Sequence, residues 1–140
     1  MKLDVSRVPI WAAAIDDQPA ALASKLEPLT EAGASLEFIL ARRAPEKPGQ
    51  GVVFVSQLKG RKQLKAAKDA GFFRTDALHS IRVEGKDRPG IGTAITRAIA
   101  DQGVNLRGYS GSVIGSRFVG FVAPDDVDES ARVIRALRKL

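Results

Sequence analysis

The feature that most constrains this chain is an internal repeat. The segment DQPAALASKLEPLTEAGASL (17–36) returns without a gap as DRPGIGTAITRAIADQGVNL (87–106). A fixed internal period indicates repeated structural units, but two copies are too few for a solenoid. A chain of 140 residues accommodates one ordinary domain or two small ones. We therefore predict two small units of the same fold, each of them too small to be very stable alone.

The second copy has the pattern of a strand followed by a helix. Alternating apolar residues predict a half-buried strand over 80–86. Pro89 suits the first turn of the next helix, Asp87 is placed to cap its N–H groups, and Gly103 ends it. The apolar stripe of this helix consists of Ile91, Ile95, Ala98 and Ile99.

The rest of the second copy predicts a hairpin and another helix. Strands over 104–114 and 117–123 are joined by a tight turn at 115–116, and Pro124 with the following acids opens the last helix. The face of this helix that we expect to be buried carries Val127, Ala131, Ile134 and Leu137. A closing strand is either missing or supplied from elsewhere, because the chain stops at Leu140.

The first copy follows the same order. Strands are expected over 8–15, 35–43 and 51–58, and a last strand with the linker over 72–81. Helices are expected from Pro19, with Leu22, Leu26 and Leu29 on its apolar face, and over 60–71. Pro28 falls within the first helix, where proline kinks a helix or costs about 3 kcal/mol.

Each copy therefore reads β-α-β-β-α with room for a closing strand, which is the ferredoxin-like arrangement. We predict an α+β protein of two tandem βαββαβ units, spanning residues 1–75 and 76–140. Right-handed crossovers place both helices of a unit on one face of its antiparallel sheet. Joining edge strands would unite the two sheets into one larger sheet and protect their edges.

Composition excludes several kinds of site. The chain contains no cysteine, which excludes disulfides, thiolate metal sites and a cysteine nucleophile. Its one histidine, His79, and the absence of a Gly-x-Ser-x-Gly motif leave no residue set suited to catalysis. We therefore expect a protein that is not an enzyme and has neither a metal nor a cofactor.

The repeated motif resembles the signature of the ACT domain. That signature consists of Asp-x-Pro-Gly, an apolar helix and then Gly-Val-Asn-Leu, and 87–106 is similar to it along its whole length. The segment 17–36 is a weaker version, so the resemblance extends over nearly the whole chain. It implies a regulatory module that binds amino acids between two such domains. In that family the loop after the first strand approaches the ligand, and a polar residue at the start of the second strand faces it from the neighbouring unit.

Carried over by position, the resemblance implies two ligand loops. The ligand-binding residues implied in the second copy are Asp87, Arg88, Pro89, Gly90, Ile91, Gly92, Asn105 and Leu106. Those implied in the first copy are Asp17, Pro19, Ala20 and Ser35. A helix N-terminus attracts a carboxylate, glycine lets the backbone approach, and an asparagine amide both donates and accepts. Because Ala20 replaces the motif's glycine and Ser35 its asparagine, we expect the second loop to be the better site. Gly92 departs from the family's bulky apolar residue, which either enlarges a pocket or marks a tight packing contact.

Two plainer interpretations stay open. The aspartates and prolines of the motif also suit helix caps and helix starts without a ligand. The net charge of +6 and the basic stripes on the last helix of each copy (Arg61, Lys65 and Lys68; Arg132, Arg135, Arg138 and Lys139) also fit nucleic acid, although solvated helix faces are the commoner case and no aromatic RNA-binding pattern accompanies them.

We therefore predict a sensor or regulatory subunit whose ligand is an amino acid. Members of the family that it resembles often pair further, which implies a homodimer of the chain, and a two-fold interface would bury edges and create repeated sites. The expected partner is a metabolic enzyme or another regulator. The first residues have Asp4 and Arg7 in place of a signal peptide's apolar run, and no stretch is long and apolar enough to cross a bilayer. The expected location is the cytoplasm, without membrane attachment.

Overall fold

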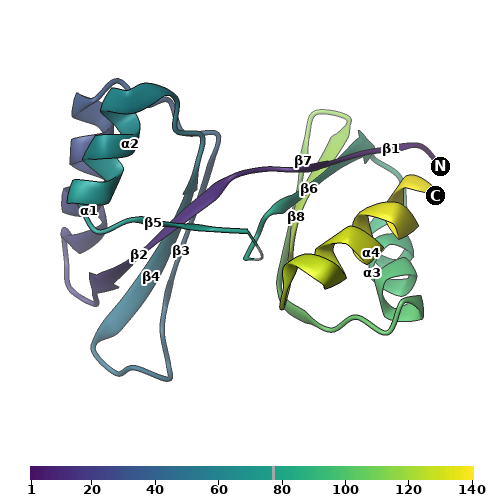
Figure 1. Ribbon diagram of the computed structural model, residues 1–140. Coiled ribbons are helices and arrows are strands. Elements are labelled where there is room, and N and C mark those ends of the chain that lie inside the picture. The colour runs from purple at the N-terminus through teal and green to yellow at the C-terminus, as the bar shows by residue number, and fades with distance from the viewer. Residues whose placement is uncertain (77) are drawn as a thin grey trace. The chain divides into compact units, whose positions relative to one another are not determined.

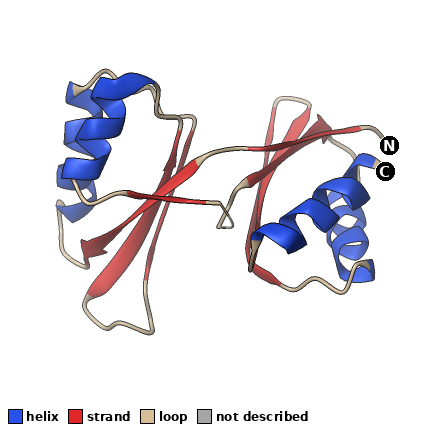
Figure 2. Cartoon of the chain, in the orientation of Figure 1, coloured by secondary structure: helices blue, strands red, loops and turns tan. Residues whose placement is uncertain are grey.

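The computed structural model describes residues 1–76 and 78–140, which form two compact units (Figure 1). Pro9–Thr75 form one unit, the continuous unit, and Met1–Val8 with Asp76–Leu140 form the other, the split unit. Each unit has a four-stranded antiparallel sheet with two helices on one face (Figure 2). This confirms the predicted α+β fold of two ferredoxin-like units. The described strands form two separate sheets and not one larger sheet.

The split unit contains the second copy of the repeat and a strand from the start of the chain. Its sheet order is β1-β6-β8-β7. Its elements are β1 (Leu3–Arg7), β6 (Ile81–Lys86), α3 (Ile91–Asp101), β7 (Leu106–Ile114), β8 (Arg117–Pro124) and α4 (Val127–Arg138).

The continuous unit contains the first copy. Its sheet order is β3-β4-β2-β5, which is the same arrangement with all strands in one stretch of chain. Its elements are β2 (Ile10–Asp16), α1 (Ala21–Glu31), β3 (Phe38–Arg43), β4 (Gln50–Ser56), α2 (Gly60–Asp69) and β5 (Phe73–Thr75). The predicted linker over 72–81 includes residue 77, which lies outside the described residues.

Strand β1 was not expected from the sequence, and it supplies the closing strand of the split unit. It pairs antiparallel with β6, from Leu3 opposite Gly85 to Arg7 opposite Ile81. Leu3 and Val5 are buried in the same core cluster as Val83 and the α3 isoleucines. The first eight residues thus lie with the split unit, although the division at 1–75 and 76–140 placed them with the first copy. Alternating apolar residues fit any open sheet edge, so local pattern alone does not assign this strand.

The two cores follow the predicted apolar stripes closely. Ile91, Ile95 and Ile99 of α3 are buried against the sheet, as predicted. In α1, Leu29 is fully buried, while Leu22 and Leu26 are partly buried against the same cluster. Trp11 packs at the edge of this second core.

Helix α4 starts later than predicted, and its buried face includes other residues than those predicted. Asp126 is the N-cap, and its carboxylate accepts a hydrogen bond from the Glu129 N–H at 2.8 Å. Val127, which we expected to be buried, is 49% exposed, and Ser130 is buried in its place. The Ser130 hydroxyl donates to the Asp126 carbonyl at 3.0 Å, which satisfies the buried polar group.

The starts of α1 and α3 also differ from the prediction. The N-cap residues are Ala20 and Gly90, and neither helix has a side-chain cap. Asp87 is therefore not the cap that we predicted, and Pro89 precedes the helix instead of occupying its first turn. Both positions belong to a tight turn, whose geometry is described below.

Pro28 lies inside α1, as the sequence indicated, and the helix continues through it to Glu31. None of the helices in the described parts of the chain combines the length and the apolarity that crossing a bilayer requires.

Candidate functional site

The loop that we predicted to hold a ligand is a tight turn between β6 and α3. The Ile91 N–H donates to the Arg88 carbonyl at 3.3 Å, and Gly90 has φ 83° and ψ 4°. With Pro89 before it, Gly90 stands at the third position of a type II turn, where a positive φ favours glycine. The motif's Pro-Gly pair is thus explained by the turn before any ligand is considered.

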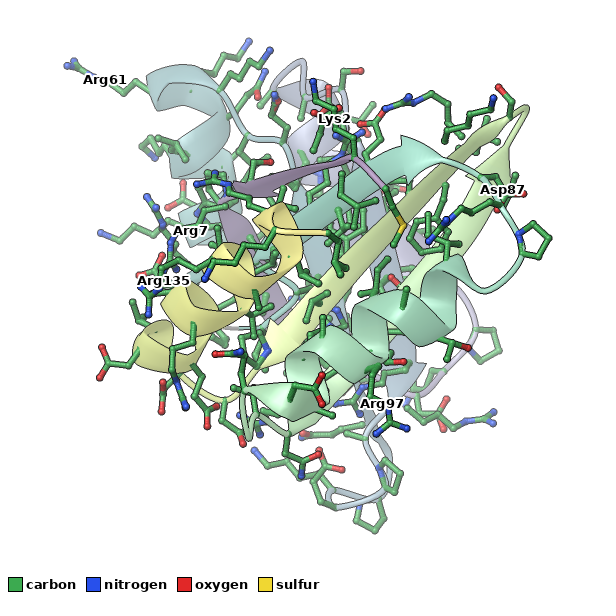
Figure 3. The ribbon with its side chains drawn as sticks, turned by 90° about the vertical axis from the view of Figure 1, so that its right-hand side faces the viewer. Lys2, Arg7, Arg61, Asp87, Arg97 and Arg135 are labelled. Carbon is green, nitrogen blue, oxygen red and sulfur yellow. The ribbon has the colours of Figure 1, made fainter. Side chains whose placement is uncertain are left out.

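This turn leaves the start of α3 accessible. Residues 87–90 are exposed, and a Cβ on Gly90 would meet no atom within 4 Å. Within the described residues, the N–H groups of Gly92 and Thr93 have no acceptor, because α3 lacks a side-chain cap. Figure 3 shows Asp87 on the loop before α3, at the outer rim of the unit. Free N–H groups at a helix start can bind a carboxylate.

The corresponding turn of the continuous unit has the same geometry. The Ala21 N–H donates to the Gln18 carbonyl at 3.2 Å, and Ala20 has φ 68° and ψ −6°. Pro19 occupies the position of Pro89. Ala20 thus adopts a left-handed conformation that disfavours any residue with a Cβ, and its methyl group stands where Gly90 leaves open space.

The aspartates of the two turns have different partners. The N–H of each donates to a hairpin loop, Asp17 to the Gly49 carbonyl at 3.0 Å and Asp87 to the Ser116 carbonyl at 2.9 Å. The Asp17 carboxylate also accepts a hydrogen bond from Arg43 Nε at 2.9 Å. No ion pair involves Asp87 in the described portion of the chain, which leaves its carboxylate available to a cation.

The polar strand-start residues lie far from the turns of their own units. Asn105 is exposed, its Oδ1 accepts the Leu106 N–H at 2.9 Å, and Leu106 packs against the core. It follows the end of α3, whose 11 residues separate it from Gly90 by about 15 Å. Ser35 is likewise exposed and lies beyond the end of α1. Within one unit, the structure does not bring the two halves of the predicted site together.

Tyr109 is a polar residue near the α3 start that sequence reasoning did not assign to the site. Its hydroxyl is buried and has no hydrogen-bond partner in the described residues. Burial raises the pKa of this hydroxyl above its ordinary value. A Cβ on Gly92 would lie 3.9 Å from the hydroxyl oxygen, which is an ordinary contact, so packing does not require a glycine there. Two features of the sequence could have indicated Tyr109 as a site residue. These are the glycine at position 92 and the presence of a single tyrosine in the strand that follows α3.

The glycines around Tyr109 permit close packing. A Cβ on Gly108 would lie 2.9 Å from Cε1 of the buried His79, and one on Gly111 would lie 2.8 Å from the Phe118 ring. These distances favour a packing role for Gly108 and Gly111, and they show that the buried His79 packs against β7.

The basic stripes are partly used inside their own units. Lys65 donates to Asp69 at 2.8 Å, and this hydrogen bond raises the pKa of Lys65. Arg132 donates to the Gln102 carbonyl at 2.9 Å, and Arg138 donates to the Val5 carbonyl of β1 at 2.9 Å. Arg61 extends from α2 into solvent (Figure 3). Arg132 and Arg138 thus hold parts of the split unit together, and this weakens the interpretation of the α4 stripe as a nucleic-acid surface.

No cluster of three or more histidine, aspartate or glutamate side chains that could hold a metal ion occurs in residues 1–76 and 78–140.

Comparison with known proteins agrees with this geometry. Residues 79–140 match the sequence model of the ACT domain. A search of curated proteins finds no match. Among solved structures, the ligand-free regulatory subunit of aspartate kinase from Thermus thermophilus is similar, with a TM-score of 0.66 and 15% identity over 99% of this chain and 96% of that one. The corresponding subunit from Thermus flavus has a TM-score of 0.62 and 17% identity, with the same coverage. Protein BT0572 from Bacteroides thetaiotaomicron has a TM-score of 0.72 and 14% identity over 94% of this chain and 88% of that one.

Proposed function

We propose that this chain, whose residues 79–140 match the ACT-domain model, is a regulatory protein without catalytic activity that binds an amino acid at the 87–92 turn. The observation that carries the proposal is the open start of α3. The N–H groups of Gly92 and Thr93 have no acceptor within the described residues, and Gly90 places no side chain over them. An α-carboxylate fits these donors, and the unpaired Asp87 carboxylate suits an α-ammonium group.

We further propose that the site is completed between units. Asn105 and Leu106 lie about 15 Å from the turn of their own unit, as the length of α3 requires. An amide that faces the ligand must then come from another unit, which favours a homodimer of the chain. Two-fold symmetry would make such sites in pairs.

The regulated partner, in this proposal, is a metabolic enzyme in the cytoplasm. Two of the similar structures are regulatory subunits of aspartate kinase. The TM-scores of 0.66 and 0.62 support a shared fold, and at 15% and 17% identity the partner enzyme is left to experiment. Regulation would follow if the ligand binds one packing of the units more tightly than another.

A thermal-shift panel of the common L-amino acids tests the proposal. A ligand at a hundred times its Kd should stabilise the native state by about 2.7 kcal/mol, which raises Tm by several degrees. Gly90→Ala and Gly90→Val should reduce the shift in that order, because each places more side chain over the N–H groups. Ala20 shows that this turn accepts an alanine, so Gly90→Ala should fold.

Gly60→Ala is the matched control. Gly60 also begins a helix with positive φ, at 78°, and a Cβ there would meet no atom within 4 Å. It should lose similar stability and keep the full ligand response. If no amino acid raises Tm, or if Gly90→Val responds as the unmodified chain does, the proposed ligand site is wrong.

A further inference from the structure

The fourth strand of the continuous unit covers only part of its neighbour. Strand β5 pairs with Ile10, Trp11 and Ala12 of β2, while β2 continues to Asp16. The last part of β2 therefore has an open edge. The Asp17 N–H donates to Gly49 on the β4 side. Since alternate residues of an antiparallel strand direct their backbone groups to opposite neighbours, Ala14 and Asp16 direct theirs to this open edge.

The split unit shows what covers this edge when the fourth strand is longer. There β1 pairs with β6 as far as Gly85, and a Cβ on Gly85 would lie 2.7 Å from Leu3 Cδ2. Ile15 holds the position of Gly85 in the repeat. Strand β5 cannot extend in the same way, because α2 ends at Asp69 and the chain must turn before it pairs.

A cleft of about 430 Å³ lies at the open edge, within the size range of small-molecule sites. It is bounded by the end of β2, the start of β4, one face of α1 and the residue after α2. Its lining residues are Ala14, Ile15, Asp16, Ala21, Ser24, Lys25, Pro28, Gln50 and Ala70.

Opposite charges and free backbone groups line this cleft. Asp16 and Lys25 both lie on it, and no ion pair joins them in the described residues. Lys25 Nζ donates to the Ala70 carbonyl at 2.9 Å. This uses one of the three N–H donors of the ammonium group and leaves the other two for a ligand. Because Pro28 has no N–H, the Ser24 carbonyl lacks its helical hydrogen bond and remains an acceptor beside the cleft.

We propose that this cleft is a second ligand site, which binds a free α-amino acid as its zwitterion. Lys25 and the N–H groups of the β2 edge bind the carboxylate, while the Asp16 carboxylate and the Ser24 carbonyl bind the ammonium group. The paired strand at Ala12 closes one end of the open edge, so it accommodates a single amino acid and is too short for a peptide strand. This site is separate from the 87–92 turn and does not depend on the function proposed there.

Amide resonances of the full-length chain, titrated with each common L-amino acid, test the proposal. At least one amino acid should shift the resonances of Ala14, Ser24 and Lys25, and its amide and N-acetyl derivatives should not. Lys25→Met keeps the side-chain stem and removes the charge, and Asp16→Asn changes an exposed carboxylate. Each should weaken binding by about tenfold or more, the loss expected for a charged hydrogen bond.

Lys59→Met is the matched control, because Lys59 is an exposed lysine of the same unit outside the cleft. It should leave the affinity unchanged, and Gly90→Val should leave the cleft resonances responsive. The proposal is overturned if no amino acid shifts the cleft resonances at millimolar concentration, or if Asp16→Asn and Lys25→Met bind as tightly as the Lys59→Met control. Shifts confined to residues 90–93 would support the first site alone.

Discussion

The two units share one topology and differ in the origin of their fourth strand. In the continuous unit α2 leads directly into the three-residue β5, and in the split unit the five-residue β1 comes from the start of the chain. A strand that is free of the preceding helix can pair along the whole neighbouring strand, whereas a strand that follows a helix immediately cannot. The same fold therefore has a filled edge beside Leu3 in one unit and an open cleft beside Lys25 in the other.

The two turns give a second comparison at a smaller scale. Both adopt the same backbone, but only Gly90 suits its positive φ, while Ala20 is strained. The backbone conformation of this turn therefore forms without the motif's glycine. The glycine makes a difference to access, because it leaves the helix start uncovered.

Deletion of residues 1–7 should have the largest effect on the difference in stability between the two units. Leu3 and Val5 are buried, and each contributes about 1.5–3 kcal/mol through burial, which is much of a small unit's stability. The split unit should lose cooperative unfolding. Tyr109, the only tyrosine, lies in this unit, and Trp11, the only tryptophan, lies in the continuous one. Loss of native Tyr109 absorbance with native Trp11 fluorescence retained is the expected result.

A peptide of residues 1–8 added to the deletion variant is the control. It should restore the Tyr109 signal, because the β6 edge that receives β1 is otherwise intact. If the deletion variant unfolds with an unchanged midpoint, β1 is not a necessary part of the split unit.

Substitutions at the two turn positions, Ala20 and Gly90, should change the stability of their units in opposite directions and by an intermediate amount. Ala20→Gly should stabilise the continuous unit by about 1 kcal/mol, and Gly90→Ala should destabilise the split unit by about the same amount. Urea unfolding followed at Trp11 and Tyr109 measures the two changes separately. Effects of the same sign in both variants would contradict the shared turn geometry.

The smallest predicted effect concerns the ion pairs on the face of the split unit's sheet that lies opposite its helices. Glu84 of β6 contacts Arg82 and Arg117, and Arg117 also lies 3.5 Å from Asp4 of β1. The Arg82 hydrogen bond lowers the pKa of Glu84, against burial, which raises it. The stabilisation is therefore fully present above the ordinary carboxyl pKa and is lost as pH falls through the lowered one.

Glu84→Gln should remove that part of the pH dependence. The difference in unfolding free energy between this variant and the unmodified chain should be larger at neutral pH than in acid, by a fraction of a kcal/mol because the pairs are partly exposed. Glu37→Gln, at an exposed position in the continuous unit, is a suitable reference variant. An equal difference at both pH values would mean that the pairs do not stabilise the sheet.

Local patterns in the sequence determined much of this protein. The repeat, the helix and strand order, the buried isoleucines of α3 and the ACT resemblance of residues 87–106 all follow from residues close together in the chain. The cap assigned to Asp87 was wrong because the Pro-Gly pair favours a turn, and a turn at that place moves the helix start to Ile91.

Only the tertiary structure decided which sheet receives the first strand, how far Asn105 lies from Gly90 in its own unit, and where the open cleft is. These are consequences of pairing between residues that are distant in the sequence. Leu3 and Val5 alternate as they would on any sheet edge, and the identity of that edge depends on the competing lengths of β1 and β5. Local sequence specifies the elements, and the geometry of their connections determines which surfaces stay uncovered.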